Sequence, residues 1–585
     1  MKFLRIIVAA LLLMSLLIPC SAITIEPPAE PEGFQWDKSK ETLLSSLWEA
    51  DIASIHEAYR MGWITCTDLT AYYLERIETY NDTYNCFITM CDDAMEQAAR
   101  CDEALASGEA QGTLFGIPIV IKDNMRYKGY YTTNGRRFEE SEIATYTADV
   151  VDYVLQEGAI IIGKTNMSTN AEDSRASYSE AVGETKNAYN SELASGGSSG
   201  GSAVATSLNF ALAGLGTDTN SSLRLPAVLN GCYSLRVTTG NLSMTGIRRL
   251  STKRDVPGVI TRTVMDQAVI LDVLSGGTTS YAENLNDNAI SGLRFGILDE
   301  YTYPRGEKNI DAEVIAAFEN AVAELESLGA EVIRVKIPEA MRIANNFLIN
   351  NNVSDQVMLY QLMKDAMEKN QVNALIFPTY LSAPHRSGLD SNGKYWHPST
   401  QPFLNNCRLL SSCAGVPEMA IPIGYHSRGA GIGMEIAALK NEEQLLLDIA
   451  YTYELNYDHR LPTDNAPDLY ASSYEGTLSQ CIDAYYDAIY QYEEAQRLAA
   501  EEAARLEEER LQQEEAARIE EERKRQEQEA LEEALREQEA EQRREALAKK
   551  QRTAQLIMLV LIVVVIVAAT TLILVVCRKR PQKTR

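Results

Sequence analysis

The sequence predicts an α/β fold in which helices pack around a largely buried sheet. Between about residues 36 and 467, short apolar runs of the buried-strand type alternate with amphipathic stretches of helical length. The 585-residue chain is 45% hydrophobic and 23% charged, which is the composition of an ordinary folded protein. Such alternation favours an α/β sandwich over an all-helical or all-strand architecture.

Individual elements follow from this pattern. Six apolar runs are expected to form strands: 116–121, 159–163, 294–298, 330–337, 374–378 and 419–424. Four amphipathic stretches are expected to form helices: 67–80, 92–107, 311–328 and 442–453. The apolar run 203–215 is also expected to form one helix, with a serine-bearing turn on either side of it, and both turns could face one site.

The N-terminal 22 residues have the pattern of a secretory signal peptide. Lys2 and Arg5 precede a short apolar run, and small residues up to Ala22 suit a cleavage site. Lipidation at Cys20 is the alternative, which Pro19 disfavours because it fits a lipobox poorly. We therefore expect cleavage after Ala22 and a mature chain outside the cytoplasm.

A second membrane signal lies near the C-terminus. Residues 556–577 carry no charge and would span roughly 33 Å as a helix, which matches the ~30 Å hydrocarbon core of a bilayer. A buried core helix is a poor alternative, because the segment has no polar face. The basic residues of 578–585 predict a cytoplasmic tail. Together the two ends predict a single-pass protein of the cell membrane, whose body is extracytoplasmic.

Residues 491–552 are predicted to form a charged helical stalk, joined to the body by a helical segment at 471–490. Positions 491–550 hold twenty Glu and twelve Lys or Arg, with no Gly or Pro, and Glu-to-cation spacings of four residues recur. A helix of this length is a stiff spacer of roughly 90 Å. A solvated linker is the alternative, and the sparse apolar residues leave a single helix or a coiled coil open.

Charge and cysteine usage exclude some partners. The chain carries 54 Lys and Arg against 82 Asp and Glu, a net charge of −28, which repels phosphate backbones and makes nucleic acid an unsuitable partner. The cysteine spacings contain no CxxC and no metal-binding pattern. Disulfides are possible outside the cell, but the sequence indicates no pairs.

The most unusual segment is the glycine- and serine-rich stretch 195–226. Gly196, Gly197 and the pair Gly200–Gly201 flank two serines, and a second polar loop follows at 216–222. Glycines permit close backbone approaches, and bunched backbone N–H groups can bind an anion. A flexible linker is the weaker interpretation, because the stretch leads directly into an apolar run inside the body.

Lys122 ends the apolar run 116–121 and is the second unusual residue. A lysine at this place often extends its amine to solvent. A desolvated lysine would instead have a depressed pKa and could act as a base. The chain has no GxSxG motif and only five His, so a Ser-His-Asp enzyme is disfavoured.

Four motifs in one order then point to a family. The segments GTLFGIPIVIKDN, GAIIIGKTNMS, SGGSSGGSAVA and GTDTNSSLRLPAVLNG resemble the amidase signature family, and the similarity covers about residues 42–467. We therefore assign residues 36–470 to an amidase domain. The resemblance implies an α/β/α sandwich with a mixed sheet, and amide hydrolysis through a Ser–cis-Ser–Lys triad without a cofactor or a metal.

The resemblance also implies roles for individual residues. Ser222 matches the family's nucleophile, Ser198 the serine that follows a cis peptide bond, and Lys122 the base. The oxyanion hole would be formed by three backbone N–H groups, those of Thr219, Asn220 and Ser221. Four residues are expected to support the two loops: Gly196, Gly197, Asp218 and Arg224. Asn220 and Ser221 stand where the family has two glycines, so side chains occupy a place where the backbone must approach the substrate carbonyl.

Three functions are compatible with the sequence. The first is a membrane-tethered extracytoplasmic amidase that hydrolyses the carboxamide of a small molecule or a peptide. The second is a non-catalytic, amidase-like surface protein for adhesion or scaffolding, which has no need of Lys122, Ser198 and Ser222 together. The third is a component of a transamidase that modifies charged tRNA, which the signal peptide and the acidic charge oppose. A long stalk would also disfavour membrane-dissolved fatty amides as substrates.

Overall fold

The computed structural model describes residues 40–304, 309–388, 410–470 and 476–548, together with residue 31 and positions 563, 564, 566 and 567. The chain divides into two compact units between Ala488 and Ile489. The expected signal peptide, the basic tail and most of the expected transmembrane segment lie outside the described residues. Within the described residues, no helix combines the length and the apolar character that a membrane span requires.

An 11-stranded sheet forms the centre of the first unit, with the strand order β1-β5-β2-β8-β10-β9-β14-β15-β13-β11-β12. β2 runs parallel to β5 and β8, and β11 runs parallel to β12 and β13, whereas the other neighbours are antiparallel. The sheet is therefore mixed, as the resemblance implied. Its strands are β1 Phe87–Met90, β2 Pro118–Lys122, β5 Ile160–Thr165, β8 Ala213–Asp218, β9 Tyr233–Arg236, β10 Val256–Thr261, β11 Arg294–Leu298, β12 Glu331–Val335, β13 Ala374–Pro378, β14 Glu418–Tyr425 and β15 Gly431–Ala437.

Two small hairpin sheets accompany it, formed by β3 Tyr131–Thr132 with β4 Glu142–Ile143, and by β6 Ser177–Ser179 with β7 Gly183–Thr185. The α-helices of the first unit are α2 Lys40–Ser46, α3 Ile52–Arg60, α4 Cys66–Tyr84, α5 Ala94–Ser107, α6 Asp149–Gln156, α7 Gly200–Ser207, α8 Arg224–Leu229, α9 Val264–Leu274, α10 Asp299–Thr302, α11 Ala312–Ser327, α12 Ala340–Asn350, α13 Val353–Asn370, α14 Leu410–Ala414 and α15 Glu443–Asn456. Three 3₁₀ turns complete it: η1 Phe138–Glu140, η2 Thr169–Ala171 and η3 Ala282–Asn284.

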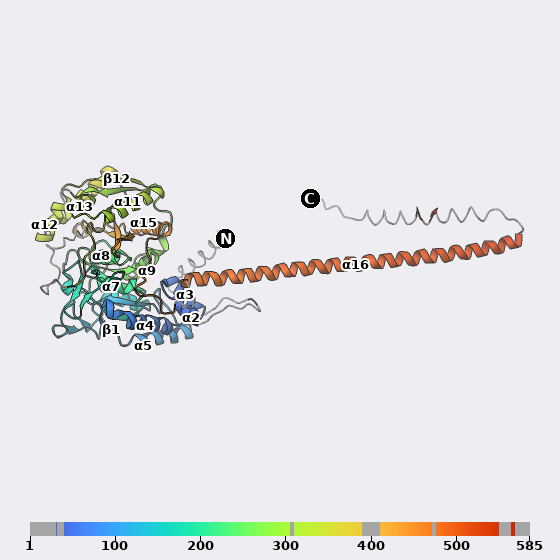
Figure 1. The fold of residues 1–585 in the computed structure, drawn as a ribbon, viewed down its shortest axis with the longest axis horizontal. Coiled ribbons are helices and arrows are strands. Elements are labelled where there is room, and N and C mark those ends of the chain that lie inside the picture. The colour runs from blue at the N-terminus through green and yellow to red at the C-terminus, as the bar shows by residue number, and fades with distance from the viewer. Residues whose placement is uncertain are drawn as a thin grey trace. The chain divides into compact units, whose positions relative to one another are not determined.

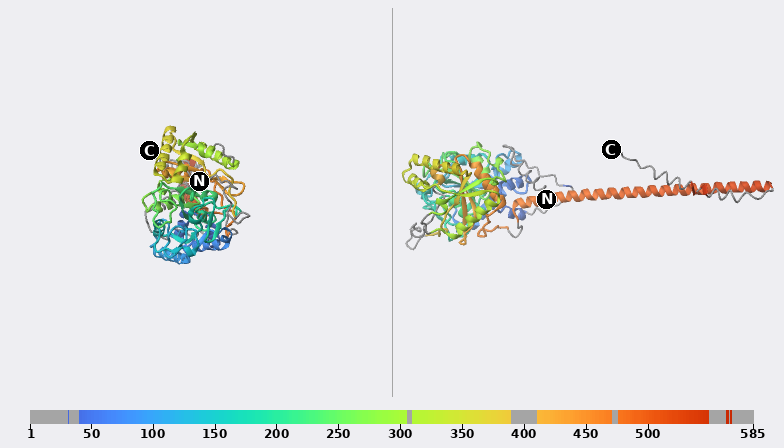
Figure 2. Two further views of the ribbon diagram at one scale, coloured as in Figure 1. Left: turned by 90° about the vertical axis from the view of Figure 1, so that its left-hand side faces the viewer. Right: turned by 90° about the horizontal axis from the view of Figure 1, so that it is seen from above.

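Different helices accompany the two ends of the sheet, and α7, α8 and α9 lie between them (Figure 1). Figure 1 shows α4 and α5 in blue at one end of the first unit, and α11, α12 and α13 in green to yellow at the other. The left view of Figure 2 shows the same separation of colours from a second direction. The yellow-green end has its own core, in which Phe347 of α12, Leu359 and Met363 of α13, and Phe377 of β13 are fully buried.

Most of the expected elements are present. All six predicted strands occur, as β2, β5, β11, β12, β13 and β14, and the four predicted helices occur as α4, α5, α11 and α15. The bounds of β11 and β13 agree with the prediction at both ends. Buried strands are well delimited here because polar or turn residues stand at each end of the apolar run.

The prediction of one helix over residues 203–215 was wrong. The structure forms α7, Gly200–Ser207, and then the central strand β8, Ala213–Asp218. Every residue of both elements is buried, so the run has no polar face from which a period could be read. Two glycines allow β8 to pack closely against its neighbours. A Cβ on Gly214 would lie 2.8 Å from Ser202 Cβ, and one on Gly216 would lie 2.7 Å from Leu223 Cδ2.

The charged segment is helical where it is described. α16 runs from Leu478 to Ala548 without a break at the expected boundary near residue 490. Its first turns belong to the first unit, where the Tyr485 ring meets Trp63 edge-on at 5.1 Å and Tyr486 donates to Glu57 Oε1 at 2.6 Å. Beyond Ile489 the apolar positions Leu498, Leu506, Leu511, Ile519, Leu531 and Leu535 are exposed. Ion pairs at i,i+3 and i,i+4 line this part, such as Arg523 with Glu520 and Glu527.

Candidate active site

The side-chain nitrogen of Lys122 lies at the centre of the candidate site. Lys122 is the last residue of β2, a fully buried strand between β5 and β8, and it is 0% exposed. The side chain therefore does not extend to solvent. Its Nζ lies 2.7 Å from Ser198 Oγ, 2.9 Å from Ser199 Oγ and 3.0 Å from Thr217 Oγ1.

Burial changes the acid–base properties of this lysine. It lowers the pKa of Lys122 to about 7, although the negative charges of Asp218 and Asp255 oppose the shift. Near neutral pH a large share of the side chain is therefore the free amine. The ammonium form donates to all three hydroxyls, whereas the free amine has only two N–H groups. In the free amine, one of the three hydroxyls therefore donates its hydrogen to Nζ instead.

Lys164, on the neighbouring strand β5, serves as a comparison. It is also fully buried, but its Nζ lies 3.4 Å from Asp123 Oδ1 and donates to the carbonyl of Tyr131 at 2.5 Å. Lys122 has no carboxylate within ion-pair distance in the described part of the chain. A buried amine surrounded by hydroxyls alone is suited to proton transfer, whereas Lys164 is suited to holding the loop after β2.

The glycine-rich loop presents Ser198 to this amine. The peptide bond between Gly197 and Ser198 is cis, and Gly196 has a φ of +75°. A Cβ on Gly197 would lie 2.5 Å from the carbonyl oxygen of Asp173, so a side chain does not fit there. The loop thus has no room for a side chain at position 197, and Ser198 and Ser199 follow the two glycines at the start of α7.

Ser222 lies in the second serine-bearing loop, between β8 and α8. The two loops are adjacent, because the Ser199 N–H donates to the Ser222 carbonyl at 3.2 Å. Ser222 is 4% exposed, and within the described residues its hydroxyl makes no hydrogen bond. The structure therefore brings Lys122, Ser198 and Ser222 to one place from three separate parts of the sequence.

The residues before Ser222 leave backbone donors available. In the part of the chain that the structure describes, the N–H groups of Thr219 and Asn220 donate to no other group. Neither Asn220 nor Ser221 has a positive φ, so this loop does not need the glycines that the family pattern has there. The Asn220 side chain points to Arg254, with its Oδ1 accepting from Arg254 Nη1.

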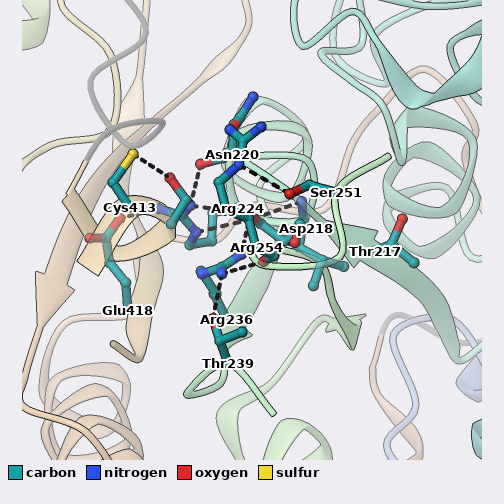
Figure 3. Close-up of polar contacts among 12 residues, drawn as sticks. Thr217, Asp218, Asn220, Arg224, Arg236, Thr239, Ser251, Arg254, Cys413 and Glu418 are labelled. Carbon is teal, nitrogen blue, oxygen red and sulfur yellow. Dashed lines mark hydrogen bonds and ion pairs between the residues drawn. The ribbon is translucent and has the colours of Figure 1, made fainter. Parts of the chain in front are cut away.

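A buried charge cluster holds the loop in place (Figure 3). Asp218 at the end of β8 accepts from Arg224 Nε at 3.2 Å and from Arg236 Nη1 at 2.9 Å. Arg224 also donates to the Asn220 carbonyl at 2.7 Å and pairs with Glu418 and Glu435 from β14 and β15. Asp218 and Arg224 thus contact both ends of the 218–224 turn.

The pKa shifts in this cluster agree with its geometry. Burial alone would raise the pKa of Asp218, but the charges of Arg224 and Arg236 outweigh it and lower that pKa. Burial raises the pKa of Glu418, an effect that Arg224 opposes and the neighbouring Glu435 increases. The cluster thus places two arginines, Arg224 and Arg236, among three buried acidic residues.

Removal of Arg224 tests this account of the loop. Arg224→Met keeps most of the side-chain volume but leaves three buried acidic groups with one arginine, so we expect the free energy of unfolding to fall by about 3–5 kcal/mol. Arg100→Ala is the control, because it removes an exposed arginine whose pair with Glu96 is worth at most about 1 kcal/mol. Urea unfolding followed by circular dichroism measures both. A loss for Arg224→Met no larger than the control's would contradict the bracing role.

The sequence did not single out every residue of the site. Ser199 and Thr217 contact Lys122 directly, and Asn124 donates to Thr217 Oγ1 at 3.1 Å. Ser199 and Asn124 stand inside motifs that were recognised, so proximity in sequence could have found them. Glu418 and Glu435 come from strands about 200 residues downstream, and no local signal marks them.

One cluster elsewhere has the residue types of a metal site. The carboxylates of Asp311 and Glu313 and the imidazole of His426 lie within 4.8 Å of one another. However, His426 Nδ1 accepts the N–H of Arg428 at 3.0 Å, which places the ring proton of a neutral imidazole on Nε2. Neither ring nitrogen then offers a free electron pair to a metal.

Comparisons with known proteins agree with this site. The family model described as Amidase matches residues 68–364, just over half of the 585 residues. A chain with this fold and this family match is of the amidohydrolase class. The protein belongs to the amidase family and is an amidase, an enzyme that hydrolyses amide C–N bonds. The adhesion or scaffold hypothesis loses its support accordingly.

Two curated relatives and one solved structure show the extent of the similarity. The chain is 33% identical to a glutamyl-tRNA(Gln) amidotransferase subunit of Nitrosococcus oceani, over 70% of this chain and 98% of the relative. It is 28% identical to the corresponding protein of Prochlorococcus marinus, over 69% and 96%. The structure of a peptide amidase from Stenotrophomonas maltophilia superposes with a TM-score of 0.61 at 25% identity, covering 71% of this chain and 98% of that one.

Proposed function

We propose that the protein hydrolyses a carboxamide with Ser222 as the nucleophile, Ser198 as the proton relay and Lys122 as the base. The observation that carries this proposal is the 2.7 Å contact between Lys122 Nζ and Ser198 Oγ, made by a fully buried lysine that no carboxylate contacts among the described residues. A buried neutral amine can accept a proton that an ammonium ion cannot.

The proposed reaction proceeds in two halves. Ser222 Oγ attacks the amide carbonyl carbon while its proton moves to Ser198 Oγ, and the Ser198 proton moves to Lys122 Nζ. The C–N bond then breaks as the same chain returns a proton to the leaving nitrogen. Water repeats the sequence on the resulting Ser222 ester and releases the carboxylic acid. The free N–H groups of Thr219 and Asn220, together with the N–H of Ser221, are the proposed donors to the oxyanion.

We further propose that this site works outside the cytoplasm and is tethered to the membrane. The support lies in the sequence: the signal-peptide pattern of 1–22, the uncharged segment 556–577 and the basic tail 578–585. Deleting residues 556–585 is expected to move the activity from the membrane fraction to the soluble fraction of expressing cells. Activity that stays soluble with the full chain would contradict the tether.

The proposed substrates are water-soluble carboxamides, either small molecules or peptide amides. The helical, charge-rich stretch of α16 beyond Ile489 supports a spacer between the body and a membrane, which makes membrane-dissolved amides unsuitable substrates. Assayed against soluble amides and long-chain fatty amides, the full-length protein is expected to prefer the soluble set in kcat/KM. A clear preference for fatty amides would overturn this substrate class.

The names of the curated relatives favour a second candidate, in which the chain releases ammonia from an amide for use by a partner. Such an obligate component would hydrolyse amides slowly by itself and faster with its partner. An amidase that works without a partner would reach its full rate as the purified chain, and turnover of soluble amides by that chain therefore separates the two candidates. The net charge of this chain is −28, which repels the phosphates of a tRNA, so a complex that acts on tRNA is the less suitable candidate.

A further inference from the structure

Arg254 lies beside the nucleophile loop and takes no part in the proposed proton transfers. It immediately precedes Asp255 and the strand β10. Its Nη1 donates to the side chain of Asn220, and its Nε donates to Ser251 Oγ at 3.4 Å (Figure 3). Its guanidinium carbon lies 6.0 Å from the centre of the Phe347 ring on α12. The guanidinium thus lies where the nucleophile loop meets the helical end of the unit.

Arg254 has no carboxylate partner among the residues that the structure describes. It forms no ion pair there, and its Nη2 makes no hydrogen bond. The adjacent Asp255 acts on it only through space, since one oxygen of that carboxylate is held by the N–H groups of Leu250 and Ser251 at 2.8 and 2.9 Å. Arg224 and Arg236, the fully buried arginines next to it, both contact carboxylates.

The surrounding segment strengthens the local positive charge. Residues 248–254 carry four cations in a chain whose net charge is −28. Arg248 is paired with Glu142 at 3.1 Å, and Lys253 Nζ is bound to the carbonyl of Asn351 at 2.7 Å. Arg254 is therefore the cation of this segment that faces Asn220, and its remaining N–H groups are available to an incoming anion.

We propose that Arg254 is a specificity residue that binds a carboxylate of the substrate. This inference rests on the proposed function, because it takes the Asn220 N–H as a donor to the scissile carbonyl. The Asn220 side chain accepts a hydrogen bond from the Arg254 guanidinium. An anion bound by Arg254 would therefore lie close to the amide group that the Asn220 N–H contacts. Arginine binds carboxylates in a planar, two-point manner. The substrate class is then a carboxamide that also carries a carboxylate, such as the half-amide of a dicarboxylic acid.

A matched substrate pair tests the proposal on the full-length protein. The pair is succinamic acid and its methyl ester, which share the amide and differ in the negative charge. We expect the wild type to prefer the acid in kcat/KM. Arg254→Gln should lower kcat/KM for the acid by about 10- to 100-fold, mainly through KM, and for the ester by less than about threefold. Arg254→Lys should fall between the two, and Lys253→Gln, which removes a neighbouring cation, should keep the wild-type preference.

Three outcomes would overturn the subsite. Equal losses on both substrates with Arg254→Gln would make the arginine a support for Asn220 only, and unchanged kinetics would give it no role. If the wild type turns over neither compound, calorimetric binding of succinamic acid and its ester to the wild type and to Arg254→Gln decides the matter: equal affinities for the acid in the two proteins refute the subsite.

If Ser222→Ala keeps its turnover while the charge preference still depends on Arg254, the proposed nucleophile fails and the subsite stands.

Discussion

Ser222→Ala is expected to lower kcat/KM for amide hydrolysis by roughly 10³-fold or more without changing the fold. The hydroxyl of Ser222 is the proposed nucleophile, and within the described residues it makes no hydrogen bond whose loss would destabilise the loop. The loop itself is held by Asp218 and Arg224 through contacts that the substitution does not touch. Steady-state kinetics on any amide that the wild type cleaves, with a urea melt of each protein, provides the measurement.

Ser107→Ala is a suitable control, because it removes an exposed hydroxyl at the end of α5. It should keep the wild-type rate and melting behaviour. If Ser222→Ala retained more than about a tenth of the wild-type rate, well short of the loss that removal of a nucleophile produces, the nucleophile would have to be another group.

Lys122→Ala is expected to lower the rate by about 10²–10⁴-fold, the usual contribution of a general base. Burial lowers the pKa of Lys122 to about 7, so the amine is protonated below that pH and neutral above it. The kcat/KM of the wild type should therefore rise with pH through about 7 and level off on the alkaline side. Lys122→Arg should not restore the rate, because a guanidinium remains protonated throughout this range.

The pH profile of the variant gives the decisive comparison. Lys122→Ala should lose the rise near pH 7 as well as the rate, provided that its urea melt shows a folded protein. An unchanged rise in Lys122→Ala would assign the titrating group to another residue and remove Lys122 from the mechanism.

Much of this candidate site could be predicted from the sequence, because its polar residues stand in short local motifs. The contact between Lys122 and Ser198 joins residues 76 positions apart, yet each stands in a motif whose glycines or apolar residues mark its place. Buried strands such as β11 and β13 were bounded correctly for the same local reason.

The two failures of the sequence prediction have different physical causes. Residues 203–215 were expected to form one helix, but every residue of the run is buried, so no exposed face reveals a period, and only the position of β8 between β2 and β10 makes part of it a strand. The partners of Arg224 on β14 and β15 were missed because strand order in a mixed sheet is a tertiary property. Nothing near Glu418 or Glu435 in the sequence indicates that they face the nucleophile loop.

Covalent trapping with a fluorophosphonate probe identifies the nucleophile itself. The oxygen of an activated serine attacks the phosphorus of the probe and displaces fluoride, and mass spectrometry of the digested protein assigns the resulting phosphonyl ester to one residue. We expect one labelled serine, Ser222, with no labelling in Ser222→Ala and much slower labelling in Lys122→Ala. A protein that hydrolyses amides but carries the label on a different residue, or labels equally fast without Lys122, would contradict this assignment.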